Sequence, residues 1–106
     1  MDAEQLSARL AAIASTQRMR IIAAVAAETT HVSELARRLG MSRALLYMHL
    51  QRLEEAGFIT GHFELSDDGK ALKLFEIVPF AISIDTATIV AAVAQTPDTP
   101  NESGKD

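Results

Sequence analysis

The sequence predicts a mainly α-helical α+β domain with about five helices and one two-stranded β-hairpin. Residues 32–58 read as two helices joined by a tight turn at Gly40. The spacing of apolar residues then changes from helical to alternating. Between the two alternating segments, Asp68-Gly69 is a strong local signal for a hairpin turn. Two helices followed at once by a hairpin form a winged helix-turn-helix, and this order is more specific than a helix pair alone.

The length and composition indicate a single globular domain over residues 1–95. The chain has 106 residues, of which 48% are hydrophobic. No run approaches the roughly 18 apolar residues of a membrane span, and the N-terminus lacks the basic segment of a signal peptide. The absence of cysteine excludes disulfides and thiolate metal ligands. We therefore expect a cytoplasmic protein with no membrane partner.

The charge is unevenly distributed along the chain. A formal net charge of -4 speaks mildly against a non-specific nucleic-acid binder. Yet Arg37, Arg38, Arg43 and Arg52 crowd the two-helix segment, whereas much of the acid lies near the termini and at residues 67–68. A local basic face on an acidic protein can still bind phosphates.

Two helices are expected before this segment. The first covers residues 3–14, with Asp2 and Gln5 as a capping box. Its apolar stripe suits either a core or a dimer interface and consists of Leu6, Leu10 and Ile13. The second helix begins near Ser15-Thr16 and turns Ile21, Ile22 and Val25 toward the core. Arg18 could reach a phosphate, but a solvated helix face is the favoured position.

The two-helix segment follows a connection over residues 28–31. Thr30 is the better N-cap candidate because histidine caps helices poorly, although His31 precedes Glu34 by three residues, as in a capping box. Gly40 can leave the first helix with a positive φ, and Ser42 is a good N-cap for the second, over about residues 42–56. The apolar positions of the two helices are Val32, Leu35, Ala36 and Leu39, then Leu46, Leu50 and Leu53.

The hairpin and a last helix complete the domain. Residues 59–65 and 72–78 alternate as strands, and Pro79 stops the second. Asp85 is expected to cap a helix over residues 86–95 whose apolar residues are Ile89, Val90 and Val93. Residues 96–106 hold nothing to bury and are expected to be disordered.

Several stretches resemble the ArsR/SmtB-type winged-helix repressors of prokaryotes. Residues 16–22, TQRMRII, look like the family's Pro-Thr-Arg-Leu-Arg-Ile-Leu, and residues 73–77, KLFEI, are similar to its Lys-Tyr-Tyr-x-Leu. Residues 32–36 with 39–42, and His49-Leu50 with Leu53 and residues 56–59, also match. The resemblance covers residues 12–95. It implies a homodimer built from the first and last helices that binds a double-stranded DNA operator as a two-fold symmetric pair.

The chain departs from the metal-sensing members of that family. Their Cys-Val-Cys is replaced here by His31-Val32-Ser33, and the last helix begins Asp85-Thr86-Ala87 and contains no histidine. The three histidines lie on different expected elements without ligand spacing. We therefore expect no metal and no cofactor. Nothing in the sequence resembles a catalytic site, so an enzyme is not expected.

The second motif helix is expected to enter the major groove of DNA. Arg43 suits guanine, Ala44 a thymine methyl group and Gln51 adenine or a phosphate, while Tyr47 can contact sugar or phosphate. The aspartates at 67 and 68 would repel phosphate unless they serve only to form the turn. The full set of expected DNA-binding residues is Ser42, Arg43, Ala44, Tyr47, Met48, Gln51, Arg38, Lys70 and Lys73.

These observations favour a homodimeric, sequence-specific DNA-binding transcriptional regulator acting as a repressor. A winged-helix module used for protein–protein interaction, with little or no DNA binding, is the alternative. The regulator could in addition respond to a small organic effector bound at the dimer interface, but the sequence does not identify such a ligand. The expected dimer interface consists of Leu6, Leu10, Ile13, Ile89 and Val93.

Overall fold

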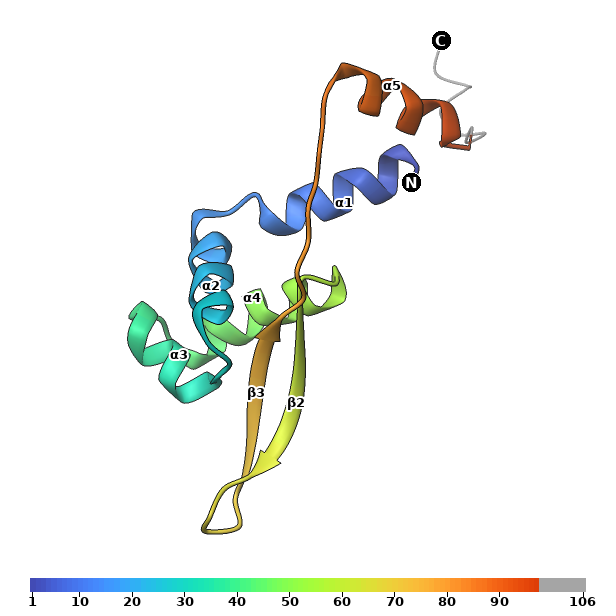
Figure 1. Cartoon of the computed structure of the whole chain (residues 1–106). Coiled ribbons are helices and arrows are strands. Elements are labelled where there is room, and N and C mark those ends of the chain that lie inside the picture. Colours follow the sequence, from blue (N-terminus) through green and yellow to red (C-terminus); the bar gives the residue numbers. More distant parts are fainter. Residues whose placement is uncertain (98–106) are drawn as a thin grey trace. The chain divides into compact units, whose positions relative to one another are not determined.

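The computed structural model describes residues 1–97 (Figure 1). Its elements are α1 (Ala3–Ile13), α2 (Thr16–Ala27), β1 (Thr30–His31), α3 (Val32–Leu39), α4 (Arg43–Glu55), β2 (Ile59–Leu65), β3 (Ala71–Ile77) and α5 (Thr86–Gln95). They form two compact units: a central unit, Ala11–Phe80, and a terminal unit that combines Met1–Leu10 with the chain from Ala81 on. The five predicted helices and the hairpin are confirmed. The tail predicted to be disordered lies outside the described residues from residue 98 on.

The sheet has three antiparallel strands in the order β1-β3-β2, where the sequence predicted two. In the hairpin, which we call the wing, Ile59 pairs with Ile77 and Leu65 with Ala71. The added strand β1 pairs Thr30 with Phe75 and His31 with Leu74. Two residues are too few for a visible alternation, which is why this strand was missed. It anchors the start of α3 to the middle of β3.

The core of the central unit lies where α2, α3 and α4 meet the base of the wing (Figure 1). The predicted apolar faces of these helices are confirmed, except that Ile22 and Leu39 are only partly buried. The largest fully buried side chains include Ile21, Leu35, Leu46, Leu50, Leu53, Phe58 and Phe75. Three of these belong to α4, so burial of one face fixes which face of that helix is left to solvent.

Capping residues determine where α3 begins and ends and where α4 begins. His31, not Thr30, caps α3: its Nδ1 accepts the Glu34 N–H at 3.4 Å, whereas Thr30 is buried in the sheet. Gly40 ends α3 in the left-handed region with φ of 62°, as predicted. Ser42 then caps α4 by accepting the Leu45 N–H at 3.2 Å. The expectation that Thr30 caps α3 was wrong, because Thr30 pairs with Phe75 in the sheet and His31 stands at the N-cap position.

The terminal unit joins the start of α1 to the end of α5. The predicted capping box of α1 is confirmed, since the Asp2 carboxylate accepts the Gln5 N–H and the Gln5 amide oxygen accepts the Asp2 N–H. Asp85 caps α5 as predicted and forms a capping box with Thr88. Thr96, placed by the sequence in the disordered tail, instead accepts the Ala3 N–H at 2.8 Å. An apolar pocket of about 380 Å³ in this unit is lined partly by Leu6, Ile82 and Ala92.

Across residues 1–97, no single helix is long and apolar enough to cross a membrane. The helices α1 and α2 reach that length and hydropathy only when they are taken together as a sharply bent pair.

Candidate nucleic-acid interface

The outer face of α4 is exposed as predicted. Leu46, Leu50 and Leu53 bury one side of the helix, which turns the opposite side to solvent. On that side Tyr47 is 46% exposed and Met48 is 64% exposed. The remaining exposed positions of this face are Ser42, Arg43, Ala44 and Gln51. A capped helix with small and basic residues in its first turn is a form that fits the major groove.

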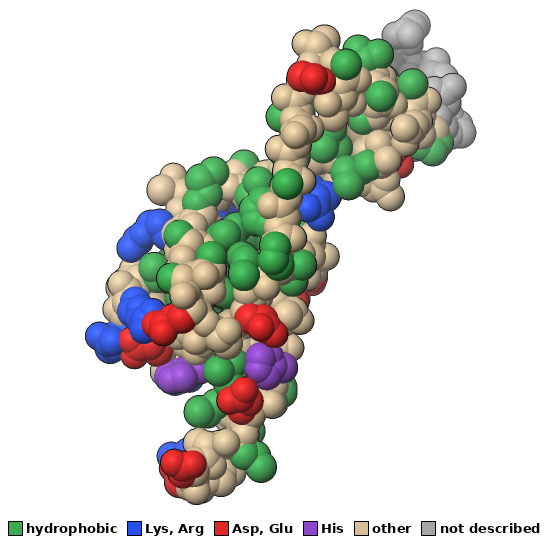
Figure 2. Space-filling model, viewed as in Figure 1, with side chains coloured by type: hydrophobic (Ala, Val, Ile, Leu, Met, Phe, Trp, Pro, Cys, Tyr) green, Lys and Arg blue, Asp and Glu red, His purple; other side chains and the backbone are tan. Residues whose placement is uncertain are grey.

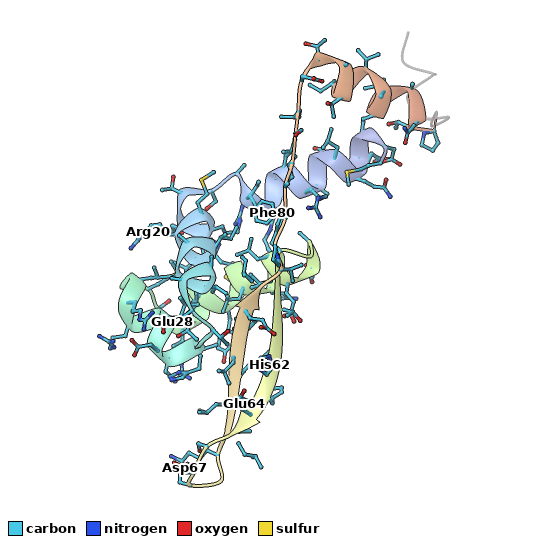
Figure 3. The ribbon with its side chains drawn as sticks, viewed as in Figure 1. Arg20, Glu28, His62, Glu64, Asp67 and Phe80 are labelled. Carbon is cyan, nitrogen blue, oxygen red and sulfur yellow. The ribbon has the colours of Figure 1, made fainter. Side chains whose placement is uncertain are left out.

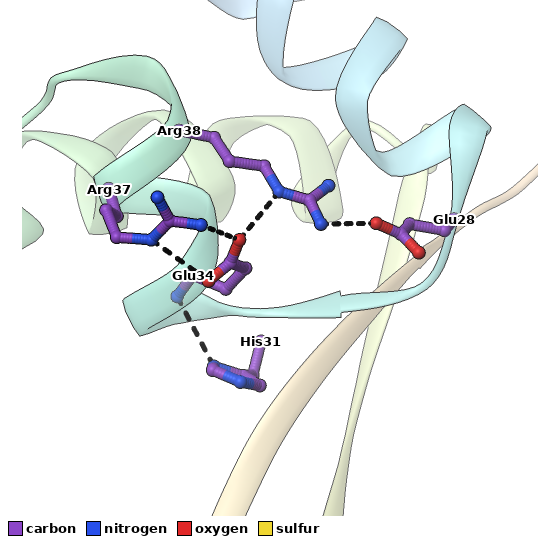
Figure 4. Close-up of polar contacts among 5 residues, drawn as sticks. All are labelled: Glu28, His31, Glu34, Arg37 and Arg38. Carbon is purple, nitrogen blue, oxygen red and sulfur yellow. Dashed lines mark hydrogen bonds and ion pairs between the residues drawn. The ribbon is translucent and has the colours of Figure 1, made fainter.

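The cations of α3 are already paired (Figure 4). Glu34 accepts hydrogen bonds from Arg37 and Arg38, and Arg38 also pairs with Glu28. These bonds hold the pKa of the Glu34 carboxyl below its usual range, mainly through Arg37 and then Arg38. Arg38, an expected DNA-binding residue, therefore has less uncompensated charge than its sequence position suggests. Figure 2 shows the paired basic and acidic side chains together over α3.

Arg43 and Lys73 differ from these cations. Within residues 1–97, neither forms an ion pair with a carboxylate. The Lys73 ammonium lies over two aromatic rings of the wing, 5.4 Å from the centre of Phe63 and 5.5 Å from that of Phe75. Such cation–π contacts orient the ammonium group without neutralising it. Both residues thus keep a free positive charge beside the outer face of α4.

Gly61 makes room for the Lys73 side chain. A Cβ atom at Gly61 would lie 2.8 Å from Cε of Lys73 and 2.9 Å from Cε1 of Phe75. The Gly61 N–H donates to the Glu54 carboxylate at 3.2 Å, which ties β2 to the last turn of α4. The wing is thereby fixed to the helix at its base, and Lys73 crosses the space that a larger residue at position 61 would fill.

A groove separates α4 from the wing. It consists of two hollows, of about 140 and 220 Å³, that share Tyr47 and Lys73. We call it the wing groove. The first hollow also reaches Arg43 and Phe63, and the second reaches Gln51. Four of the expected DNA-binding residues, Arg43, Tyr47, Gln51 and Lys73, are thus brought to one surface of the central unit.

The turn of the wing is acidic and internally bonded. Ser66 donates its hydroxyl to the Asp68 carboxylate, which lowers the pKa of Asp68, and the Ser66 hydroxyl accepts the Lys70 N–H at 3.1 Å. Lys70 Nζ lies 4.0 Å from Asp68, so its charge is partly compensated. Asp68 therefore has a structural part in the turn, while Asp67 is exposed at its tip (Figure 3).

A cluster around His49 was not found from the sequence. Arg18 donates to the carbonyls of Ala11 and Ala12 at 3.2 and 2.6 Å, and its guanidinium lies 3.2 Å from Nδ1 of His49. Nε2 of His49 lies 2.9 Å from the Gln17 amide oxygen. Arg18 is always a donor, so Nδ1 accepts and Nε2–H donates. Arg18 is thus a structural link between helices, rather than a residue on a solvated face as expected.

Burial lowers the pKa of His49, and the nearby charges of Arg18 and then Arg52 lower it further. The unfolded chain therefore binds a proton more readily than the folded one. We expect the free energy of unfolding contributed by His49 to be complete above about pH 6.5 and to fall as the pH drops below it. Urea unfolding at pH 7.5, 6.5 and 5.5 should show this decline, and His49→Gln should flatten it. Parallel pH profiles for the two proteins would contradict this account of the cluster.

The other histidines do not build a metal site. Within the described part of the chain, no group of three histidine or carboxylate residues could hold a metal ion. His62 lies 3.5 Å from Glu64 and 4.0 Å from Glu76 on the face of the wing visible in Figure 3, and His31 is occupied as a helix cap.

Comparison with known proteins agrees with this geometry. Residues 13–62 match the helix-turn-helix domain family, whereas no curated protein sequence matches the chain. Among solved structures, NolR from Sinorhizobium fredii is 22% identical, with a TM-score of 0.60 over 88% of this chain and 84% of that chain. HlyU from Vibrio cholerae is 20% identical, with a TM-score of 0.61 over 85% and 86%.

A third similar structure is a homodimeric winged helix-turn-helix DNA-binding domain from Mycobacterium bovis, described as a possible ArsR-family transcriptional regulator. It is 19% identical, with a TM-score of 0.63 over 86% of this chain and 73% of that chain. The match to the domain family includes α2, α3 and α4, and the likeness of fold extends over the wing and beyond. Residues 13–62 therefore contain a helix-turn-helix domain, and the likeness to these solved structures shows that the chain has the winged helix-turn-helix fold.

Proposed function

We propose that the protein is a sequence-specific regulator of transcription that binds double-stranded DNA with α4 in the major groove. One observation carries this proposal: the exposed face of α4 and strand β3 of the wing bring two uncompensated cations, Arg43 and Lys73, to the same groove. The charge of the whole chain is acidic, so a local cationic surface on a groove-fitting helix supports specific rather than general binding.

The residues of α4 divide into base readers and backbone contacts. Arg43, in the first turn, can offer its planar fork to guanine, and Ala44 can contact a thymine methyl group. Gln51 donates to Glu55 at 3.2 Å in the free protein, so pairing with adenine requires it to leave that carboxylate. Tyr47 and Ser42 are exposed on the same face and their hydroxyls can donate to phosphate, while the exposed Met48 can offer an apolar contact to base edges.

A salt titration tests the proposal. The protein should bind fragments of its own promoter region more tightly than random DNA, with an affinity that falls steeply as salt rises. The logarithmic slope should be about -0.9 for each phosphate contacted. Repression is the expected outcome at the promoter, because a bound dimer there would compete with transcription. Salt-independent or absent binding would refute the proposal.

Exposed apolar residues on the wing favour the second candidate, a protein-interaction module. Phe63 is 68% exposed and Leu65 is 78% exposed, and the acidic turn adjoins them. A wing of this kind suits a protein partner better than a phosphate backbone. The salt titration separates the two functions, because only DNA binding requires counterion release.

We further propose a homodimer through the terminal helices. Ile89 and Val93 are 49% and 58% exposed on α5, while Leu6, Leu10 and Ile13 on α1 are partly exposed. Covering such apolar side chains favours association. Sedimentation at low micromolar concentration should give twice the chain mass, and Val93→Glu should shift the protein toward the monomer. A wild-type monomer at that concentration would refute the symmetric operator model.

A further inference from the structure

The inner end of the wing groove, next to the start of α3, has the chemistry of an anion site. The hollow of about 140 Å³ is lined by His31, Arg43, Tyr47 and Lys73 together with small and apolar residues, and no carboxylate lines it. The neighbouring hollow, by contrast, includes Glu54. A polar cavity that holds cations and no acid favours a bound anion.

We infer that this hollow binds one phosphate group, with Lys73 as its principal ligand. Lys73 is held between Phe63 and Phe75, and within residues 1–97 no carboxylate pairs with it. These two rings hold the Lys73 ammonium in place before the anion binds, so less conformational entropy is lost on binding. The site also requires glycine at position 61, because any larger side chain there would displace Cε of Lys73.

His31 and Tyr47 supply the neutral donors. Nδ1 of His31 accepts the Glu34 N–H, which leaves the proton of the neutral ring on Nε2 and makes that nitrogen a donor. The Tyr47 hydroxyl has no hydrogen-bond partner among the described residues and can also donate. Arg43 adds positive charge at the rim. The hydrogen bond by which His31 caps α3 thus also fixes the tautomer of its ring. In that tautomer Nε2 carries the proton and can donate to an anion.

The phosphate can come from the DNA backbone or from a free phosphate compound. In the first case, which rests on the proposed function, the hollow would hold a backbone phosphate beside the major groove while α4 reads the bases. In the second, phosphate in solution would occupy the hollow and compete with DNA. Both sources present phosphate oxygens to Lys73. A titration with inorganic phosphate tests the free compound, and the salt dependence of DNA binding tests the backbone phosphate.

Tyr47 provides a direct probe, because it is the only tyrosine and the chain has no tryptophan. Inorganic phosphate is titrated at constant ionic strength while tyrosine emission is recorded, and DNA affinity is measured against salt. The test variant is Lys73→Met, which keeps the stem between the rings but removes the charge. Arg20→Met, on α2 and outside the hollow, is the control for a lost positive charge. His31→Ser keeps a helix cap but removes the ring donor.

A saturable emission change with millimolar phosphate, weakened about tenfold or more in Lys73→Met and reduced in His31→Ser, identifies the free compound as a ligand. If free phosphate has no effect, the salt slope for DNA should fall by about 0.9 in Lys73→Met and stay unchanged in Arg20→Met, which identifies the backbone phosphate. Circular dichroism of each folded variant excludes misfolding as the cause.

The two proposals fail differently. Wild-type protein that binds DNA with a steep salt slope, while Lys73→Met alters neither that slope nor the phosphate titration, overturns the phosphate site and leaves the regulator intact. Wild-type protein that takes up phosphate with the expected dependence on Lys73 but shows no salt-dependent DNA binding refutes the regulator and supports the site.

Discussion

Leu50→Ala is expected to destabilise the protein by about 2–5 kcal/mol, because it empties a position at the centre of the core. Leu50 is only 1% exposed on the inner face of α4, between Leu46 and Leu53. Loss of its side chain leaves a cavity where α4 packs on the rest of the central unit. Since native domains are stable by only about 5–15 kcal/mol, this loss removes a large share of the free energy of unfolding. The measurement is the free energy of unfolding in urea.

Met48→Ala is the matched control on the same helix. Met48 is 64% exposed on the outer face, so its loss should change the free energy of unfolding by less than about 0.5 kcal/mol. The pair of variants therefore tests how α4 is rotated about its own axis. Equal destabilisation by both variants would mean that α4 does not turn the face of Met48 to solvent. It would also contradict the DNA contacts proposed for that face.

The elements that repeat an apolar pattern over several turns could be predicted from sequence. The spacing of Leu46, Leu50 and Leu53 reveals the buried face of α4, and the alternation from residue 59 on reveals the wing. Caps with ordinary chemistry, such as Ser42 and Asp85, were also predictable, because a side-chain oxygen next to an apolar run has a local effect. Local rules thus reach most of the helices and both strands of the hairpin.

Features that depend on distant residues were not predictable. Strand β1 exists because Thr30 meets Phe75, 45 positions away by their numbering, and no pattern within two residues announces that pairing. Arg18 meets His49 only after α2 packs on α4. The role of Gly61 appears only when Lys73 crosses it on the neighbouring strand. Each requires the three-dimensional register, which a single sequence does not contain.

The candidate interface was predictable in its residue types but not in its balance of charge. The sequence places Arg38, Arg43 and Lys73 in one basic set, yet Arg38 is paired with Glu28 and Glu34 whereas Arg43 and Lys73 remain uncompensated. Glu28 comes from the end of α2, ten residues before Arg38. Only the packing of α2 and α3 determines which arginine is left for a ligand.

Arg43→Ala is expected to weaken binding to the specific DNA site by about 1–3 kcal/mol and to relax the preference at one position of each half-site. Arg43 begins the helix proposed to enter the groove, where base edges come within reach, and its guanidinium fork fits O6 and N7 of guanine. Its side chain is exposed, so the fold should persist. The measurement compares affinities for the promoter site, for single-base variants of it and for random DNA.

Arg20→Ala provides the control for lost positive charge. Arg20 is an exposed cation of α2 (Figure 3), so its removal lowers the net charge equally without touching the outer face of α4. It should weaken all sequences slightly and leave their ranking unchanged, whereas Arg43→Ala should reduce the gap between specific and random DNA. If Arg43→Ala binds the promoter site as tightly as wild type, recognition does not run through α4. The exposed Phe63 and Leu65 of the wing would then make protein binding the better account of the surface.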